Sequence, residues 1–185
     1  MALKVLSMKN TVRLCAVAVA FFSVQFLAGC ASDDAQVFSP YMEETFRAWQ
    51  GAGPSNLDGQ AFYKMPSGRL VSCAGSKVTL LPANGYNVEA LQSIGAGKGM
   101  PVNYNRSALK FSHTTMCDGS GRFSFQKLPN QNWIVLINLS WQEKGGATAL
   151  WSKEDKGGSL YQEILLEPGD NKIVLSNPDF VADQP

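Results

Sequence analysis

The stretch TTMCDGSGRFSFQKLP, which runs from Thr114 to Pro129, combines a cysteine, an acidic glycine-rich turn and an alternating aromatic run. The Asp118-Gly119-Ser120-Gly121 segment consists of residues that tolerate positive φ or bond to their own backbone, which favours a tight turn. The alternation that follows, with Phe123 and Phe125 on one face, is typical of a half-buried strand. The stretch therefore predicts a sheet corner followed by a strand at residues 122–127.

The same period of two continues through most of the chain beyond residue 57. Glycine, proline and asparagine separate the apolar runs, and short strands with such punctuation predict an all-β sandwich of about seven strands. The expected strands are residues 59–64, 77–81, 122–127, 132–142, 148–152, 160–167 and 172–176, with a short piece at 69–72 and turns that include Gly145-Gly146 and Gly157-Gly158.

The run NWIVLINLSWQ at residues 132–142 is apolar on both sides in its middle, which predicts a central strand covered on both faces. Residues 82–112 fit no regular strand, although 88–94 favour a helical turn. Long insertions on rigid scaffolds commonly carry binding function, so we expect a binding surface in this region.

The N-terminus has the features of an export signal. Lys4, Lys9 and Arg13 precede a stretch without charged residues at 14–32. The segment Leu27-Ala28-Gly29-Cys30 resembles the lipobox of bacterial lipoproteins, which implies cleavage before Cys30 and lipid attachment to that cysteine. A retained signal anchor is the alternative, because the apolar run is nearly long enough to span a bilayer.

If the source is a Gram-negative bacterium, Ala31 in place of an aspartate after the lipidated cysteine implies transfer to the outer membrane. We expect the folded part to be held there by its lipid, facing the periplasm.

The segment SPYMEETFRAWQ at residues 39–50 follows the tether and predicts a short amphipathic helix that starts near Ser39 and Pro40. The expected divisions are a signal peptide at 1–29, a lipidated tether and helix at 30–56, the sandwich at 57–178 and a tail at 179–185.

Charge argues against one class of partner. The mature chain keeps 13 of the 16 basic residues and all 15 acidic ones, which leaves a net charge of about −2. No block of Lys or Arg remains to follow phosphates, so we expect no binding of nucleic acid.

Two cysteines remain once Cys15 has left with the signal and Cys30 carries lipid. In an oxidising compartment Cys73 and Cys117 are most simply a structural disulfide. A redox pair or a metal site are the alternatives. A redox pair would more typically be C-x-x-C, and zinc would need further ligands, for which His113 is the single imidazole.

Two pieces of the chain resemble the carboxypeptidase regulatory-like domain. These are AGSKVTLLP at residues 74–82 and DGSGRFSFQKLP at 118–129, together with an early strand at Gly59 and an apolar strand after Pro129. The resemblance covers about residues 57–176 and implies a transthyretin-like Greek-key sandwich. It implies a non-catalytic module, and it carries no catalytic residue or cofactor to this chain.

Three motifs suggest chemistry at first sight. The glycine-rich SIGAGKG at residues 93–99 lacks the glycine and hydroxyl positions of a phosphate loop. The turn at Asp118 has the first ligands of a calcium loop, but Arg122 stands where an oxygen is needed. His113 is the only histidine and has no recognisable nucleophile motif beside it. We therefore expect no enzyme activity, no metal and no cofactor, with a hydrolase centred on His113 as a minor alternative.

Aromatic residues are the remaining candidates for a contact surface. Tyr86 and Tyr104 lie in the long insertion and Trp151 in a short hairpin, and we expect these three side chains to be exposed. The leading hypothesis is a lipid-anchored envelope protein whose sandwich binds or scaffolds a protein partner through residues 82–112. The alternative is a module that binds peptidoglycan or another polysaccharide.

Overall fold

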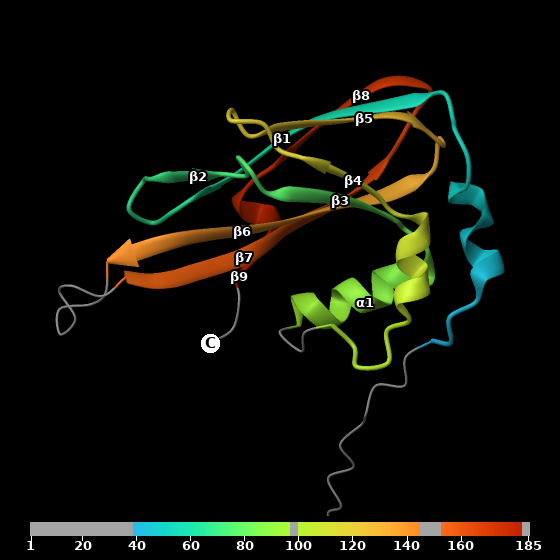
Figure 1. Ribbon diagram of the computed structural model, residues 1–185, viewed down its shortest axis with the longest axis horizontal. Helices are drawn as coiled ribbons and strands as arrows, with labels where there is room; N and C mark the ends of the chain where they lie inside the picture. The colour runs from blue at the N-terminus through green and yellow to red at the C-terminus, as the bar shows by residue number, and fades with distance from the viewer. Residues whose placement is uncertain (1–38, 97–99, 145–152, 183–185) are drawn as a thin grey trace, which may run out of the picture. The chain divides into compact units, whose positions relative to one another are not determined.

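Two β-sheets packed face to face form the body of the computed structural model, which describes residues 39–96, 100–144 and 153–182 (Figure 1). All of these residues lie in the second of the two units of the chain, Phe38–Pro185. The strands are β1 (Ser55–Lys64), β2 (Leu70–Ser72), β3 (Lys77–Pro82), β4 (His113–Met116), β5 (Arg122–Leu128), β6 (Asn132–Lys144), β7 (Lys153–Leu165), β8 (Gly169–Leu175) and β9 (Phe180–Ala182). The helices are α1 (Gly85–Gly95) and the 3-10 helices η1 (Glu43–Trp49), η2 (Arg106–Phe111) and η3 (Asn177–Asp179).

The first sheet is built around β1. β8 pairs with it in parallel, whereas β5 and β2 pair with it antiparallel. The backbone of Ala61 donates to the carbonyl of Gly121 and accepts from the N–H of Cys73. Because the N–H and C=O of one strand residue point to the same side, β5 and β2 follow one another along the same edge of β1.

The second sheet has the strand order β4-β3-β6-β7-β9, and all its pairs are antiparallel. β6 lies at its centre and pairs with β7 along the whole length of both strands. The prediction of a central strand at residues 132–142 is therefore confirmed, as is the prediction of an all-β sandwich.

The main core fills the space between the sheets. The inward positions of β6 alternate with outward ones, so that Trp133, Val135, Ile137 and Leu139 all face the first sheet and are buried. The indole N–H of Trp133 donates to the carbonyl of Pro129, which satisfies a polar group that would otherwise be buried without a partner. The partners across the core include Leu57, Ala61, Phe123, Phe125, Leu128, Ile173 and Leu175.

The insertion at residues 82–112 covers the other face of β6. Ile134 packs there with Leu81 and with Leu91 of α1 in a second buried cluster, which explains why the middle of the strand is apolar on both sides. The helix begins at Gly85 and is capped by Asn84, whose side chain accepts from the N–H of Asn87. The helical turn expected at 88–94 is thus a full helix with a structural role.

A third apolar cluster joins the helices to one another. Phe46 of η1 is fully buried and stacks on Phe111 of η2, with ring centroids 4.9 Å apart. Trp49 donates its indole N–H to the carbonyl of Asn132 at 2.8 Å and so ties η1 to β6. The helix begins at Glu43, not near Ser39 as the sequence suggested, and it is a 3-10 helix.

Several strand boundaries differ from expectation. β4 was not predicted, and Gly157-Gly158 lies inside β7 instead of in a turn. Phe180–Ala182 forms β9 in the region expected to be a tail, and β1 begins at Ser55 inside the expected tether. The expected strand at 148–152 lies outside the described residues.

A disulfide between Cys73 and Cys117 joins the two sheets. Cys73 follows β2 in the first sheet and Cys117 follows β4 in the second, and both side chains are buried. The predicted pairing is confirmed, and because the two sulfurs are bonded to each other they are not ligands of a metal site.

Removing this cross-link should destabilise the domain. The bonded cysteines are 44 residues apart, and closing a loop of that length in the unfolded chain is worth up to about 4 kcal/mol. We expect the double variant Cys73→Ala, Cys117→Ala to lose about 2–4 kcal/mol of unfolding free energy in urea titrations. The wild-type protein under strong reductant should lose a similar amount, and an unchanged midpoint in both would contradict the proposed role.

The packing of α1 on β6 predicts an unequal effect of two neighbouring substitutions. Leu91 is buried against the sheet while Gln92 is exposed. Leu91→Asp places a carboxylate in an apolar layer and should cost at least about 3 kcal/mol of unfolding free energy. Gln92→Asp is the matched control and should change it by less than about 0.5 kcal/mol. Similar losses in both variants, measured by urea denaturation, would mean that α1 does not hold the sheet in this way.

Candidate functional site

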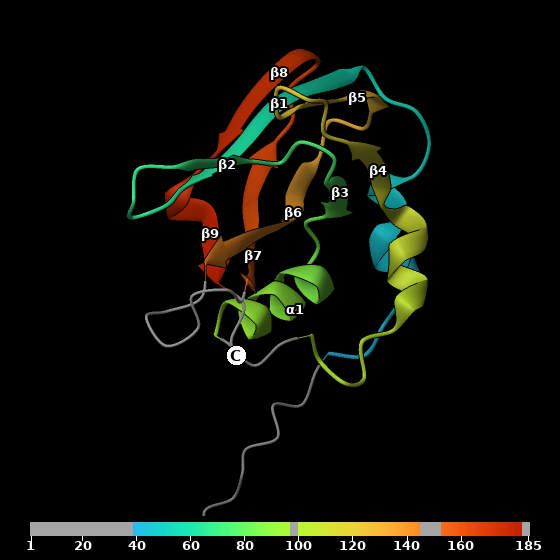
Figure 2. The same ribbon diagram turned by 60° about the vertical axis from the view of Figure 1, so that its left-hand side comes forward.

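A groove of about 760 Å³ opens on the first sheet and along the adjoining edge of β4. In Figure 2, β8, β1 and β5 form the upper layer, on the side of the sandwich away from α1. The residues that line it come from four strands and the turn before β5: Asp58, Gly59, Gln60, Thr115, Met116, Asp118, Arg122, Phe123, Ser124, Lys172, Ile173 and Val174.

Strand alternation places the polar lining residues on the outer face. Leu57 and Ala61 of β1 are buried in the core, so Asp58 and Gln60 between them point outward. In the register of the sheet, Asp58 lies between Lys172 of β8 and Ser124 of β5. Gln60 lies in the next row, between Val174 of β8 and Arg122 of β5. Side chains in such rows share one face, so these two rows form a continuous polar patch.

The charged side chains of this patch are not held by hydrogen bonds or ion pairs within the described chain, and the charge of Arg122 contributes to the lowered pKa of nearby Asp118. Within the described part of the chain, the side chains of Asp58, Arg122 and Lys172 make no hydrogen bond or ion pair with any residue. Gln60 makes only a long hydrogen bond, 3.4 Å, from its amide to the carbonyl of Ser120. The donors and acceptors of the groove are therefore available to a ligand.

The turn before β5 holds one wall of the groove. One carboxylate oxygen of Asp118 accepts from the Ser120 N–H at 2.8 Å, the Ser120 hydroxyl at 2.7 Å and the Arg122 N–H at 2.9 Å. These hydrogen bonds, led by that from Arg122, lower the pKa of Asp118. Gly121 has φ +74° and packs closely on Ser72 and the Ala61 carbonyl, which leaves little room for a side chain. The position of Arg122 is thus fixed by a rigid turn.

Apolar contacts are also present in the groove. Met116 and Val174 line it and are each 57 % exposed. The ring of Phe123 lies directly under Gly59, where a Cβ atom would be only 2.1 Å from the ring. Glycine at this position therefore lets β5 and β1 pack with the aromatic ring between the sheets. The groove above this ring is lined by both polar and apolar side chains.

The residues that the sequence suggested as an exposed surface are placed differently. Tyr86 is only 7 % exposed, because its ring is part of the cluster that holds η1, α1 and η2 together, so this prediction is wrong. Tyr104 is half-buried and donates its hydroxyl to Asn87 at 2.8 Å, and burial raises its pKa to about 12. Trp151 and the expected lipidation site Cys30 lie outside the described residues.

His113 sits in β4 against the core. Its ring meets that of Trp133 edge to face, with centroids 5.4 Å apart, and burial lowers its pKa. Across the described ranges no group of three or more His, Cys, Asp or Glu side chains is arranged to hold a metal ion. In those same ranges, no helix has both the length and the hydropathy needed to cross a bilayer.

Sequence reasoning did not single out the groove, apart from Asp118 and Arg122 of its turn. Asp58, Gln60 and Ser124 stand at the polar positions of alternating strands, a pattern that every half-exposed strand shows. The signal that they meet in one site is the parallel pairing of β8 with β1, and strand pairing is not readable from a single sequence.

Comparisons with known proteins find a solved structure with a similar fold, but they find no match to a sequence family or to a curated protein. No family model matches the chain, and no curated protein matches it significantly. Among solved structures, the chain is similar to PA1324 from Pseudomonas aeruginosa, a proposed carbohydrate-binding protein, with a TM-score of 0.66 and 20 % sequence identity. The match covers 76 % of this chain and 99 % of that protein, and at this identity it shows a shared fold alone.

The burial of His113 predicts a specific pH dependence of stability. The pKa of His113 in the folded protein lies below the ordinary value of 6.5. Near and below pH 6.5 the imidazole is therefore protonated to a greater extent in the unfolded chain than in the folded one. The unfolding free energy should therefore fall as the pH drops from about 7.5 to about 5.5. His113→Gln should remove most of this slope in urea titrations, and an identical slope in both proteins would show that His113 does not cause it.

Proposed function

We propose that the protein is a non-catalytic glycan-binding module and that the groove over β8, β1 and β5 holds the glycan. The observation that carries this proposal is the set of side chains from Asp58, Arg122 and Lys172, which lie together in the groove and make no hydrogen bond or ion pair with the described residues. Charged groups left uncommitted on a rigid sheet are a preformed set of hydrogen-bonding groups.

The chemistry of the groove suits a polyhydroxylated ligand. Sugar hydroxyls both donate and accept, and the groove offers an acceptor in Asp58, donors in Arg122 and Lys172, and both in Gln60. Met116 supplies an exposed apolar surface for the C–H faces of a sugar ring. The similarity in fold to PA1324, itself a proposed carbohydrate-binding protein, supports the same class of ligand.

Protein binding through residues 82–112 has less support than the sequence suggested. α1 from this insertion covers Ile134 and Leu81, and Tyr86 is buried among the helices. Of the two aromatic residues that the sequence suggested there, Tyr86 is buried and Tyr104 is half-buried, so they offer little aromatic surface to a protein partner. For this reason the groove, and not the insertion, is our candidate for the ligand.

The proposed function includes a lipid anchor at the membrane. Support comes from the lipobox-like segment that ends at Cys30 and from the charged and apolar regions before it. Placement in the outer membrane and membership of the carboxypeptidase regulatory-like family stay predictions from the sequence. A periplasmic domain held in this way would meet peptidoglycan as the glycan polymer of its compartment.

The groove proposal is tested by substitutions that leave the core intact. We expect Arg122→Ala and Asp58→Asn each to weaken binding to peptidoglycan fragments or polysaccharides about tenfold, because a hydrogen bond to a charged group is worth about 1.5–3 kcal/mol. Lys77→Ala is the control, since Lys77 is exposed on β3 outside the groove. Calorimetric titration and co-sedimentation with purified sacculi provide the measurement.

Two results would count against this site. Equal binding by Arg122→Ala, Asp58→Asn and the wild type would remove the groove from the proposal. Loss of binding in Trp151→Ala alone would move the glycan site to the segment that contains Trp151. Circular dichroism on each variant separates loss of a contact from loss of the fold.

A further inference from the structure

The described chain begins on the side of the domain opposite the groove. The backbone N–H of Ser39 donates to the carboxylate of Glu89 at 3.3 Å, and Glu89 belongs to α1. α1 covers the outer face of the second sheet, whereas the groove opens on the outer face of the first (Figures 1 and 2). The two sheets and the helix therefore lie between the groove and the point where the chain enters.

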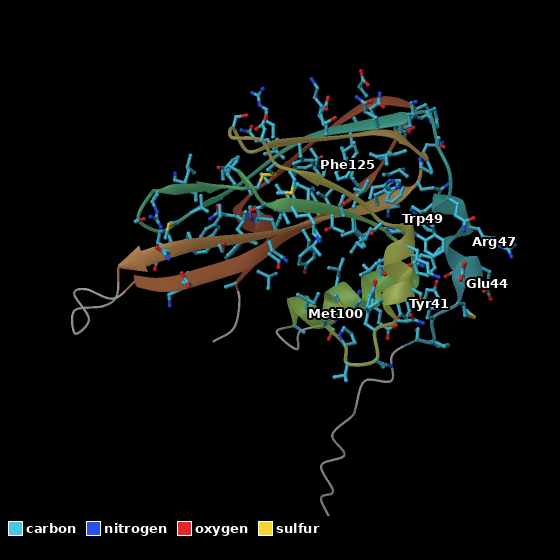
Figure 3. All side chains as sticks on the ribbon, in the orientation of Figure 1. Tyr41, Glu44, Arg47, Trp49, Met100 and Phe125 are labelled. Carbon is cyan, nitrogen blue, oxygen red and sulfur yellow. A yellow bond between two sulfur atoms is a disulfide. The ribbon has the colours of Figure 1, made fainter. Side chains whose placement is uncertain are left out.

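Four of the exposed large apolar side chains belong to the elements on the α1 side of the domain. Met42 precedes η1, Met100 and Val102 lie in the connection from α1 to η2, and Leu109 is in η2. Val102 is fully exposed and the other three are roughly half exposed. Figure 3 shows Met100 and Tyr41 on the α1 side of the domain and Phe125 on the side of the first sheet. These four side chains are called the apolar cap below.

The three helices around the cap carry no net charge, and Lys98 adds one positive charge to the connection before Met100. Arg47, Arg106 and Lys110 on η1 and η2 are matched in number by Glu43, Glu44 and Glu89 on η1 and α1. The connection at residues 100–105 contains no charged residue. A surface of this kind can enter the interface of a zwitterionic bilayer by apolar contact and does not need anionic lipid.

The length of the tether limits where the domain can lie. Eight residues lie between Cys30 and Ser39, and the nine Cα–Cα steps that join these two residues span at most about 30 Å in any conformation. Packed sheets lie about 10 Å apart and a covering helix adds a similar distance, so a tether that reached the groove side would have to pass about 20 Å of packed layers. The tether therefore keeps the α1 side close to the bilayer more easily than it does the groove side.

We propose that the apolar cap docks on the bilayer that holds the lipid on Cys30, with Met100 and Val102 in the lipid interface. The groove then faces away from that bilayer, toward glycan polymers in the aqueous compartment and not toward sugar headgroups of the same leaflet. This inference rests on the lipid anchor and the groove of the proposed function, and it adds an orientation and a choice between two classes of glycan.

The test uses the full-length lipidated protein in phosphatidylcholine vesicles, labelled with an environment-sensitive fluorophore at single introduced cysteines. Val102→Cys reports on the cap, and Val174→Cys reports on the groove with a side chain of the same kind. Intact mass must show one label per chain, which confirms that the Cys73–Cys117 disulfide is unchanged.

The expected result is a blue shift at position 102 and quenching by brominated lipid of about half of its emission, with neither change at position 174. A label at 102 that stays in water while the protein floats with the vesicles would overturn the inference. Quenching at 174 in place of 102 would also overturn it, because the groove would then face the lipid. A blue shift at 102 that needs added envelope protein would assign the cap to a protein partner and reject the bilayer.

Separate measurements distinguish this inference from the proposed function. If the mature protein lacks lipid mass at Cys30, or if Cys30→Ser floats as the wild type does, the anchor is wrong. If vesicle-bound protein does not retain peptidoglycan fragments while the label at 102 is quenched, the groove assignment fails and the docking stands. Val102→Asp should keep the protein on vesicles through its lipid but reduce quenching of a label at Met100→Cys by about half, whereas Leu165→Asp, an exposed site outside the cap, should not.

Discussion

The burial of β6 on both faces is the constraint on which the rest of this structure depends. A strand that is apolar on both sides needs two separate covers, because neither face tolerates water. The first sheet supplies one cover through Leu57, Phe123 and Phe125, and α1 supplies the other through Leu91. The long insertion is therefore a part of the core, and the face it cannot reach, the outside of the first sheet, is the one left open for a ligand.

The same short segment of chain that stabilises the sandwich also shapes the groove. Cys117 closes the disulfide between the sheets, and its neighbours Met116 and Asp118 line the groove on either side of it. The turn that follows is held by the carboxylate of Asp118 and by the positive φ of Gly121, so Arg122 enters β5 in a defined position. A ligand that bound there would meet groups already in place, which reduces the entropy lost on binding.

Local patterns explain what could be predicted from the sequence. The alternation of apolar and polar residues predicts β5 and β6. The number of cysteines left in the mature chain predicts the pairing of Cys73 with Cys117. Gly157-Gly158 resembled a turn, yet both residues pair with β6 inside β7, and the missing side chain of Gly158 makes room for the ring of Phe180. Tyr86 resembled a surface aromatic, but the cluster that buries it is assembled from η1, α1 and η2, which are far apart in the sequence. The groove could not be predicted for the same reason, since it depends on which strands flank β1.

The composition of the groove sets the kind of binding that this domain can achieve. Among the residues lining it, the one aromatic ring, that of Phe123, is only 5 % exposed, so stacking contributes little and polar contacts dominate. Hydrogen bonds exchanged with water give modest net energies, and a single groove of this type should bind a glycan weakly. Many copies held on one surface by lipid would engage a repeating polymer at high effective concentration, so weak sites together would give firm attachment. If the proposed lipid anchor holds the protein, its attachment to a glycan polymer would thus depend on the tether as much as on the affinity of each groove.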